Sequence, residues 1–328
     1  MSGADIPYQL RPSKFVDRQI FVELLSRLIQ SRGPENYIYV SMGGRHLVDH
    51  YAVYRELGIK AQFSFDGDTN AVARQQFNRP TDATVCRSMN SSALPSELDA
   101  IAATFPRKRN FIVWLDFTGT DRKLQLQEAE QTLIRLKHGD VFRLTMNADV
   151  RNLKQGSLGG SATRGASRAK CLRDQLEDVM PTGITEIGDD DFPSVLCKCI
   201  ELATLRAAAQ VTNLDFIPTL ITSYADGQRM LTVTCAVSDR TSEEKFPNAQ
   251  FRRWAFASAG WNDMHDIAVP ILSAKERYKL DGNLGKTPKR MLTALKFWPA
   301  EDEPASLIAL ANYKKYQRFY PAFRHVDD

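Results

Sequence analysis

The sequence has few of the features that mark membrane, secreted and metal-bound proteins. Among its 328 residues no run approaches the roughly 18 consecutive apolar residues of a membrane helix, and the opening MSGADIPYQLRPSKF has no apolar signal core. The five cysteines are odd in number and scattered, unlike a disulfide framework. The five histidines are scattered too, and no serine or cysteine lies in a nucleophile elbow. We therefore expect a cytoplasmic protein with reduced thiols and no hydrolase chemistry.

Charge and metal-ligand patterns are also weak. Lys and Arg number 43 against 39 Asp and Glu, so the formal net charge of +4 permits an acidic partner without requiring one. Cys197 and Cys199 lie in a helical run, where two positions differ by about 200° around the axis. That spacing does not suit a shared metal ion, and we predict no metal site from it. A hydrophobic content of 43% is enough for a large core.

The first two thirds of the chain alternates between two patterns. Short β-rich runs are each followed by a stretch with helical spacing of apolar residues, which is typical of a parallel sheet with helices on both faces. The β-rich runs are 36–41, 60–65, 83–88, 110–117 and 140–146. The helical stretches between them are 45–57, 69–77, 91–104 and 124–137.

The flanking regions break this alternation. An amphipathic helix with Ser13 as its N-cap precedes the first run, and residues 193–211 form another helix. Two long β-rich runs in 216–239 meet at Asp226-Gly227, a strong hairpin signal. We predict an N-terminal helical segment (1–35), a sheet domain (36–241) with an insertion at 150–192, and a helical C-terminal lobe without strands (242–328).

This order of elements resembles the class I S-adenosylmethionine-dependent methyltransferases, whose sheet ends in a hairpin. The stretches YVSMGG, FSFDGD, RQQFN, VWLDFTG, FRLTMNA and NYKKYQRFYPAF are similar to bacterial O-methyltransferase-like proteins over most of the chain. The resemblance implies an α/β, Rossmann-type, mostly parallel seven-stranded sheet with a C-terminal antiparallel hairpin, plus the helical lobe. It also implies S-adenosylmethionine as cofactor and O-methyl transfer to an acceptor, a small molecule or a nucleic acid, that the sequence does not identify.

The loop after the first strand is the candidate cofactor loop. A charged, adenosine-bearing cofactor needs backbone N–H groups at a helix N-terminus and little side-chain bulk nearby. Ser41, Gly43 and Gly44 meet that need. Ser41 and Met42 stand where the family often has an acidic residue and another glycine, and a tight strand-to-helix turn is the alternative.

The ends of the next two strands supply the other cofactor candidates. Asp66 follows the second strand, where a carboxylate accepts hydrogen bonds from the ribose hydroxyls of a bound nucleotide. Its alternative role is that of a turn residue, with Asp68 as the N-cap of the following helix. Asn90, after the third strand, is our candidate for the adenine contact, with a helix cap as the alternative.

The fourth and fifth strands end in candidates for chemistry. Asp116 is the predicted catalytic residue, because a carboxylate there can orient or deprotonate an acceptor hydroxyl. It is followed by Phe-Thr-Gly and not by the prolines of enzymes that methylate nucleic-acid amines, and Thr118 and Asn147 are predicted to contact the acceptor. A divalent metal held by Asp116, Asn147 and Asp149 is an alternative whose spacing fits poorly.

Arg74 and Asn78, in the stretch ARQQFNRP, are the remaining acceptor candidates, because they lie at the end of a helix beside the cofactor edge. The alternative is a helix that simply ends at Asn78 before the turn at Pro80.

Two basic stretches raise the question of nucleic-acid binding. The insertion combines Gly and Ser with basic residues, a composition that suits either a phosphate clamp or a solvated loop. Its basic residues are Arg151, Lys154, Arg164, Arg168, Lys170 and Arg173. The tail aromatics at 313, 316, 319 and 320 could stack on bases, but their spacing fits one apolar stripe of a packed helix, which we favour.

Two other functions fit the same sequence. The chain could be a non-catalytic Rossmann-type nucleotide sensor or a subunit of a larger bacterial assembly, which the incomplete glycine loop favours. A nucleotide-processing enzyme would instead need an acidic cluster at the strand ends that acts with a metal ion.

Overall fold

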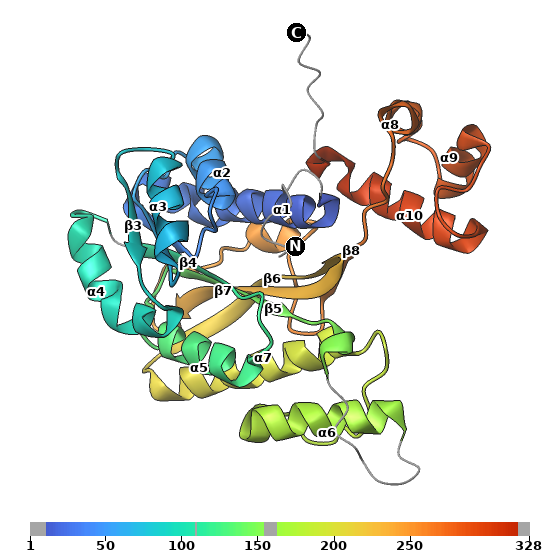
Figure 1. Ribbon diagram of the computed structural model, residues 1–328. Helices are drawn as coiled ribbons and strands as arrows, with labels where there is room; N and C mark the ends of the chain where they lie inside the picture. The colour runs from blue at the N-terminus through green and yellow to red at the C-terminus, as the bar shows by residue number, and fades with distance from the viewer. Residues whose placement is uncertain (1–10, 109, 154–162, 321–328) are drawn as a thin grey trace. The chain divides into compact units, whose positions relative to one another are not determined.

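The computed structural model describes residues 11–108, 110–153 and 163–320 of the chain. Figure 1 shows a sheet with helices on both of its faces. The strands are β1 (Tyr37–Ser41), β2 (Gln62–Asp66), β3 (Thr84–Ser88), β4 (Asn110–Asp116), β5 (Val141–Asn147), β6 (Leu214–Asp226), β7 (Gln228–Asp239) and β8 (Met264–Ile267). The α-helices are α1 (Pro12–Ile29), α2 (Val48–Leu57), α3 (Thr69–Phe77), α4 (Leu94–Thr104), α5 (Arg122–Leu133), α6 (Arg164–Leu176), α7 (Phe192–Gln210), α8 (Ala274–Asp281), α9 (Pro288–Leu295) and α10 (Glu303–Tyr316).

The strand order confirms the predicted fold. The sheet runs β3-β2-β1-β4-β5-β7-β6-β8, with parallel pairing from β3 to β5 and antiparallel pairing between β5 and β7. The order reverses beside β1, so the connections after β1 and β4 run to opposite sides of the sheet at the carboxyl ends of the strands. Ligands of doubly wound sheets bind at that edge.

The hairpin is confirmed, and one strand was missed. β6 and β7 meet at Gly227, whose φ of 105° favours glycine. The prediction of no strand after residue 242 is wrong, because Met264–Ile267 forms β8 at the edge of the sheet. Four residues with two polar side chains are too short to show period-2 alternation in the sequence.

Some predicted helix boundaries are also wrong, for local reasons. α2 begins at Val48 and not at Arg45, because Gly43, Gly44 and Leu47 all have positive φ angles that no right-handed helix accommodates. Ser13 is not an N-cap, since α1 already includes Pro12. The first α1 amides instead reach Asp226, with Ser13 N donating to Oδ1 at 3.2 Å and Lys14 N to Oδ2 at 2.7 Å.

The two faces of the sheet differ in chemistry because side chains alternate along each strand. One face presents residues such as Val40, Phe63 and Leu115, which join the main hydrophobic core; Figure 1 shows α4, α5 and α7 on that side. The opposite face buries Arg143 and Thr145, with Arg143 Nη1 donating to Thr234 Oγ1 at 2.8 Å. Thr145 Oγ1 on the same face lies 2.9 Å from Trp114 Nε1, which donates to it, so hydrogen bonds offset part of the cost of burying polar groups there.

The chain divides into two compact units. Residues 21–223 and 228–265 form the sheet unit, and residues 11–20, 224–227 and 266–320 belong to the C-terminal unit. The domain boundaries expected from the sequence stay predictions.

The tail aromatics pack inside the C-terminal unit, as favoured. Tyr313 and Tyr316 are fully buried, and Phe319 and Tyr320 are 8% exposed. Tyr313 Oη donates to Asp281 Oδ1 at 2.6 Å, and Tyr316 Oη donates to the Asp266 carbonyl at 3.0 Å. These rings are therefore not free to stack on nucleic-acid bases.

Candidate functional site

Strand register brings the predicted site residues to one edge of the sheet. Ser41, the last residue of β1, is level with Ser64 of β2 and Trp114 of β4. Asp66 and Asp116 each come two residues later on those strands, so they flank the glycine loop on its two sides. The loop and the two carboxylates thus belong to one edge, as the sequence predicts.

The glycine loop, which we define as residues 42–47 between β1 and α2, folds back onto its own sheet. Gly43 and Gly44 have φ angles of 60° and 57°, in the left-handed region. A Cβ atom at Gly43 would lie 2.5 Å from Ser64 Oγ and 2.6 Å from Leu47 Cδ2, so side chains of the protein occupy that direction. Gly43 is therefore required by packing as well as by backbone angle, whereas Gly44 is exposed. Any ligand contact falls to the exposed side of the loop.

Asp66 has one carboxylate oxygen engaged and one available. Asp68 N donates to Asp66 Oδ1 at 2.9 Å. Asp66 Oδ2 makes no hydrogen bond within the described ranges 11–108, 110–153 and 163–320, and the residue is half-buried. Asp68 caps α3 by accepting from Asn70 N at 2.9 Å, which confirms its predicted alternative role. The cap is thus supplied by Asp68, and Asp66 keeps an acceptor oxygen.

Asn90 lies directly beside the end of β2. Met89 N donates to the Asp66 carbonyl at 3.0 Å, which holds the loop after β3 against the loop after β2. Asn90 Oδ1 is so close to Gly67 that a Cβ there would meet it at 2.7 Å. The Asn90 side chain is exposed, and it makes no cap hydrogen bond to the short 3-10 helix Ser91–Ala93 that follows.

Asp116 and Thr118 lie at the end of β4. Asp116 is half-buried and in register with Thr145, and Phe117 N donates to the Thr145 carbonyl at 3.0 Å, extending the pairing by one residue. Thr118 is exposed on the loop that follows. This arrangement leaves a carboxylate and a hydroxyl at the strand end beside the glycine loop.

Asn147 and Asp149 are occupied by local bonds. The Asn147 side chain donates to Gln228 Oε1 at 3.1 Å and accepts from Asp149 N at 3.1 Å. Asp149 accepts from Arg151 Nε at 2.8 Å, and this pairing holds the pKa of the Asp149 carboxyl below its usual range. The described residues contain no cluster of three His, Cys, Asp or Glu side chains placed to hold a metal ion.

The two candidates on α3 differ in their surroundings. Arg74 is exposed. Asn78 is the C-cap residue of α3, as the alternative interpretation predicted, and its Nδ2 donates to the Arg45 carbonyl at 3.1 Å. Asn78 therefore contacts the glycine loop. The acceptor roles of Arg74, Asn78, Thr118 and Asn147 stay predictions.

Arg122 is a buried polar residue of the same region that the sequence analysis did not single out. It is 1% exposed, with Nε donating to the Asn147 carbonyl at 3.3 Å and Nη1 donating to Gln175 Oε1 at 3.3 Å. Burial lowers the pKa of its guanidinium to about 10. Its position in the stripe with Leu126, Ala129 and Leu133 on the buried face of α5 was the available signal.

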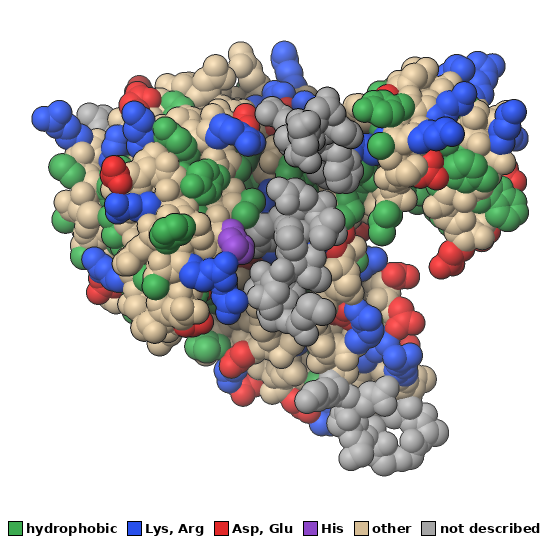
Figure 2. Space-filling view, turned by 45° about the horizontal axis from the view of Figure 1, so that its top comes forward, with side chains coloured by type: hydrophobic (Ala, Val, Ile, Leu, Met, Phe, Trp, Pro, Cys, Tyr) green, Lys and Arg blue, Asp and Glu red, His purple; other side chains and the backbone are tan. Residues whose placement is uncertain are grey.

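The basic residues of the insertion are largely paired with acids. Arg168 Nη2 lies 2.6 Å from Asp189 Oδ1, and Lys170 Nζ lies 2.7 Å from Asp174 Oδ2. Lys154 falls outside the described residues. On the face shown in Figure 2, Lys and Arg side chains are spread out with Asp and Glu side chains among them. Such pairing weakens the case for a phosphate clamp on α6.

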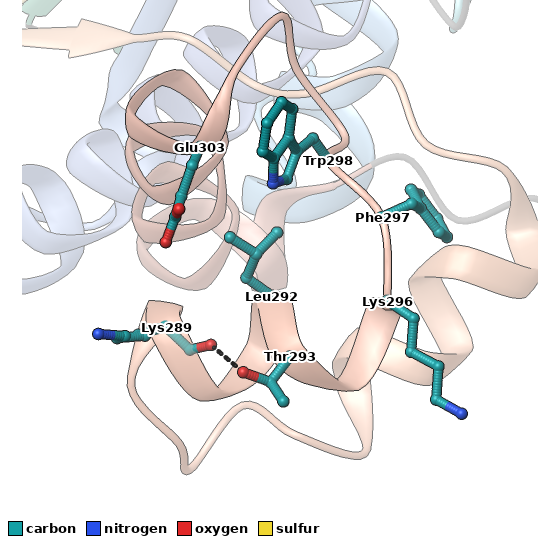
Figure 3. A pocket seen from close by; sticks show the side chains of 7 residues that line it. All are labelled: Lys289, Leu292, Thr293, Lys296, Phe297, Trp298 and Glu303. Atoms are coloured by element: carbon teal, nitrogen blue, oxygen red, sulfur yellow. Dashed lines mark hydrogen bonds between the residues drawn. The ribbon is translucent and has the colours of Figure 1, made fainter.

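A shallow pocket of about 270 Å³ lies in the C-terminal unit. Its lining residues are Lys289, Leu292, Thr293, Lys296, Phe297, Trp298 and Glu303. In Figure 3, Leu292 and Trp298 face one another, whereas Phe297 and Lys296 point away. None of the residues predicted to bind cofactor or acceptor lines this pocket.

The cysteines are all unpaired. Burial raises the thiol pKa of Cys197 and Cys199 to about 12, so neither is a ready thiolate ligand for a metal. Within the described part of the chain, no helix has the length and apolar character needed to span a membrane.

Comparison with known families decides the assignment. The model of the family described as "Putative O-methyltransferase" matches residues 6–328. The chain belongs to this family. The match confirms the resemblance stated from the sequence motifs, and it extends over the sheet, the insertion and the C-terminal helices. A search among curated proteins found no match.

Solved structures are similar only at a distance. A putative methyltransferase from Thermobifida fusca shares 10% identity with a TM-score of 0.39, covering 68% of this chain and 81% of its own. An S-adenosylmethionine-dependent methyltransferase from Anabaena variabilis shares 9% identity with a TM-score of 0.37, covering 67% and 84%. One from Clostridium acetobutylicum shares 10% identity with a TM-score of 0.35, covering 71% and 93%.

Proposed function

We propose that the protein transfers the methyl group of S-adenosylmethionine to an oxygen atom of an acceptor. The family match over residues 6–328 supports this reaction class. The observation within the fold that carries the proposal is Asp66, which keeps one carboxylate oxygen available at the carboxyl end of β2. An ionised carboxylate at that place suits the hydroxyls of a ribose.

The residues around Asp66 fit the rest of an adenosine. Asn90 has an exposed amide beside Gly67, which suits hydrogen bonding to an adenine edge. Gly44 is exposed with a positive φ, so a ligand can approach the backbone there without a side chain in the way, although the Gly44 N–H itself donates to the Met42 carbonyl at 2.7 Å. We assign Asp66 to the ribose, Asn90 to the base, and the exposed side of the Ser41–Gly44 loop to the charged tail.

Bound S-adenosylmethionine supplies an electrophilic methyl group on a sulfonium sulfur. The protein contributes by holding the acceptor oxygen in line with that group, which is an effect of orientation. In our proposal Asp116 accepts a hydrogen bond from the acceptor hydroxyl and takes its proton as the new O–CH₃ bond forms. In that transfer the electrons of the S–CH₃ bond would remain on the cofactor's sulfur, so Asp116 has only the acceptor's proton to take.

Calorimetry with S-adenosylhomocysteine tests the cofactor site. We expect the wild-type protein to bind, and Asp66→Ala to raise Kd by roughly 10- to 100-fold, because a charge-assisted hydrogen bond contributes about 1.5 to 3 kcal/mol. Asp82→Ala is the matched control, since Asp82 is an exposed carboxylate whose partner, Arg79, is also a surface residue. Absence of binding by the wild-type protein would remove the methyltransferase proposal.

A methyl-transfer assay with S-adenosylmethionine, run beside the calorimetry, tests the sensor alternative. A protein that binds the cofactor but transfers no methyl group to hydroxylated small molecules or RNA would act as a sensor or subunit. If the protein is a transferase, Asp116→Asn should lower the rate of methyl transfer and leave the affinity for S-adenosylhomocysteine unchanged, because Asp116 is assigned to the acceptor and not to the cofactor.

A further inference from the structure

Helix α3 is attached to the proposed cofactor site at both of its ends. At its N-terminus, Asp66 Oδ1 accepts from Asp68 N, the N-cap residue, at 2.9 Å. At its C-terminal half, Gln75 and Asn78 both donate to backbone carbonyls of the glycine loop. The helix therefore connects Asp66, the carboxylate proposed to bind the ribose, with the loop proposed to hold the charged tail of the cofactor.

Gln75 is the buried centre of the second attachment. Its side chain is fully buried, and its two polar atoms face two different elements. Ser64 Oγ of β2 donates to Gln75 Oε1 at 3.0 Å. Gln75 Nε2 donates to the Met42 carbonyl at 3.2 Å. One amide thus joins β2, α3 and the glycine loop, and a buried amide in such a bridge is costly to remove.

The glycine loop also has hydrogen bonds of its own, one of which runs from Gly43 N to Ser41 Oγ at 3.3 Å. Within the loop, Gly44 N donates to the Met42 carbonyl at 2.7 Å and Leu47 N donates to the Gly44 carbonyl at 3.4 Å. Leu47, the N-cap residue of α2, makes no side-chain cap bond. Two adjacent glycines add conformational freedom that must be lost before a ligand is held. Bonds from α3 remove part of that freedom in advance, which is preorganisation.

We infer that Gln75 is a positioning residue for S-adenosylmethionine, because it holds the Met42 carbonyl and thereby fixes the glycine loop in its binding shape. This inference rests on the proposed function. Asn78, three residues later, makes a second hydrogen bond to the loop, from its Nδ2 to the Arg45 carbonyl at 3.1 Å. Gln75 touches no ligand itself in this assignment and acts through the loop.

Substitutions separate the two bonds of Gln75. Gln75→Met keeps the length of the side chain and fills the buried space but removes both bonds. Ser64→Ala removes only the bond from β2 and leaves the bond to Met42. Gln76→Met is the positional control, because Gln76 is the exposed neighbour on the same helix.

Calorimetry with S-adenosylhomocysteine gives the first readout. We expect Kd to rise about 10-fold in Gln75→Met, less than about 3-fold in Ser64→Ala, and not at all in Gln76→Met, since one neutral hydrogen bond and a more mobile loop are involved. If Gln75→Met does not fold, Asn78→Ala replaces it, because Asn78 is half-buried and carries a tie to the same loop.

Amide hydrogen exchange of the ligand-free protein gives a second readout that a general loss of stability does not reproduce. The Gly44 amide should exchange faster in Gln75→Met, while amides of β4 and β5 keep their wild-type rates. Wild-type affinity in Gln75→Met, or in Asn78→Ala where Gln75→Met does not fold, would overturn the inference and leave the proposed function standing. Failure of the wild-type protein to bind S-adenosylhomocysteine would overturn both.

Discussion

The two ends of the parallel strands are built differently. At the amino end, Asp140 is fully buried and accepts from Asn110 Nδ2 at 2.7 Å, Phe111 N at 2.8 Å and Lys137 N at 2.8 Å. Tyr37 Oη donates to the Gly139 carbonyl at 2.9 Å nearby. At the carboxyl end, Asp66 is half-buried with an available oxygen.

The difference agrees with the proposal that the carboxyl end binds the cofactor, while the amino end contributes to stability. Hydrogen bonds at the amino end engage both carboxylate oxygens of the buried Asp140 within the protein. The carboxyl end keeps exposed or half-exposed polar groups, namely Gly44, Asn90, Asp116 and Thr118. Substitutions at the amino end should therefore reduce stability, whereas those at the carboxyl end should reduce cofactor affinity.

The largest expected effect is on stability at the amino end. Asp140→Ala leaves three N–H donors without an acceptor, two of them on Asn110 and Phe111 at the start of β4. We expect the free energy of unfolding to fall by roughly 3 to 5 kcal/mol. Urea unfolding measures it, with Asp82→Ala as the exposed control. A loss below about 1 kcal/mol would show that the two ends are not differently built.

The pH dependence of stability sharpens the same contrast. Burial raises the pKa of Asp140 to about 6, although three N–H donors favour its ionised form. Between about pH 4 and pH 6 the folded protein then binds a proton that the unfolded chain releases, so the contribution of Asp140 falls as pH rises. The total change is about 3 kcal/mol.

Unfolding of wild type and Asp140→Asn from pH 4 to pH 7 checks this expectation. The free energy of unfolding of wild type minus that of Asp140→Asn should fall by up to about 3 kcal/mol from pH 4 to pH 7. A rise of this signed difference toward pH 7 would mean that the three donors outweigh burial, and that the pKa of Asp140 lies below its usual value.

A smaller effect is expected at the glycine loop. Gly43→Ala combines left-handed strain with a clash at Ser64, and should cost about 2 to 3 kcal/mol of stability. Gly58→Ala is a matched control, because Gly58 has a φ of 71° and nothing within 4 Å of its Cβ position. It should cost about 1 kcal/mol. Equal losses of stability in Gly43→Ala and Gly58→Ala, measured by thermal unfolding, would mean that the loop moves away from Ser64 and relieves the clash.

The smallest effect on stability is expected at Asn90. Asn90→Ala removes an exposed amide, so the free energy of unfolding should change by less than about 0.5 kcal/mol. The Kd for S-adenosylhomocysteine should rise about 5-fold through loss of one neutral hydrogen bond. Ser92→Ala, an exposed neighbour, should change neither quantity. An unchanged Kd in Asn90→Ala would remove Asn90 from the cofactor site.

Local patterns predicted the elements better than their roles. The alternation of strand and helix patterns and the Asp226-Gly227 turn correctly indicated the first seven strands, because both signals are local. β8 was missed because its pairing comes from β6 and not from its own sequence. Asp68 was correctly predicted as a cap, since an N-cap is defined by the residues next to it.

The candidate site was harder to predict, because its side chains contact residues that are far away in the sequence. No spacing rule relates Gln75 to Met42, because their bond depends on how α3 packs against the loop after β1. The same holds for Arg122, which meets Asn147 and Gln175 from two other elements. Gly43 was proposed as clearance for a cofactor, but its Cβ direction is filled by Ser64 and Leu47, which the sequence could not indicate.

The sequence by itself determined the succession of strands and helices, the hairpin and the motifs by which the chain belongs to its family, because these depend on neighbours along the chain. Only the tertiary structure decided which polar groups are used up inside the protein and which remain available. Asp140 and Asp66 both lie at the end of a strand. Asp140 accepts hydrogen bonds from three N–H donors, whereas Asp66 accepts one, at Oδ1. That distinction arises from packing between distant segments, which fixes burial and hydrogen-bond partners.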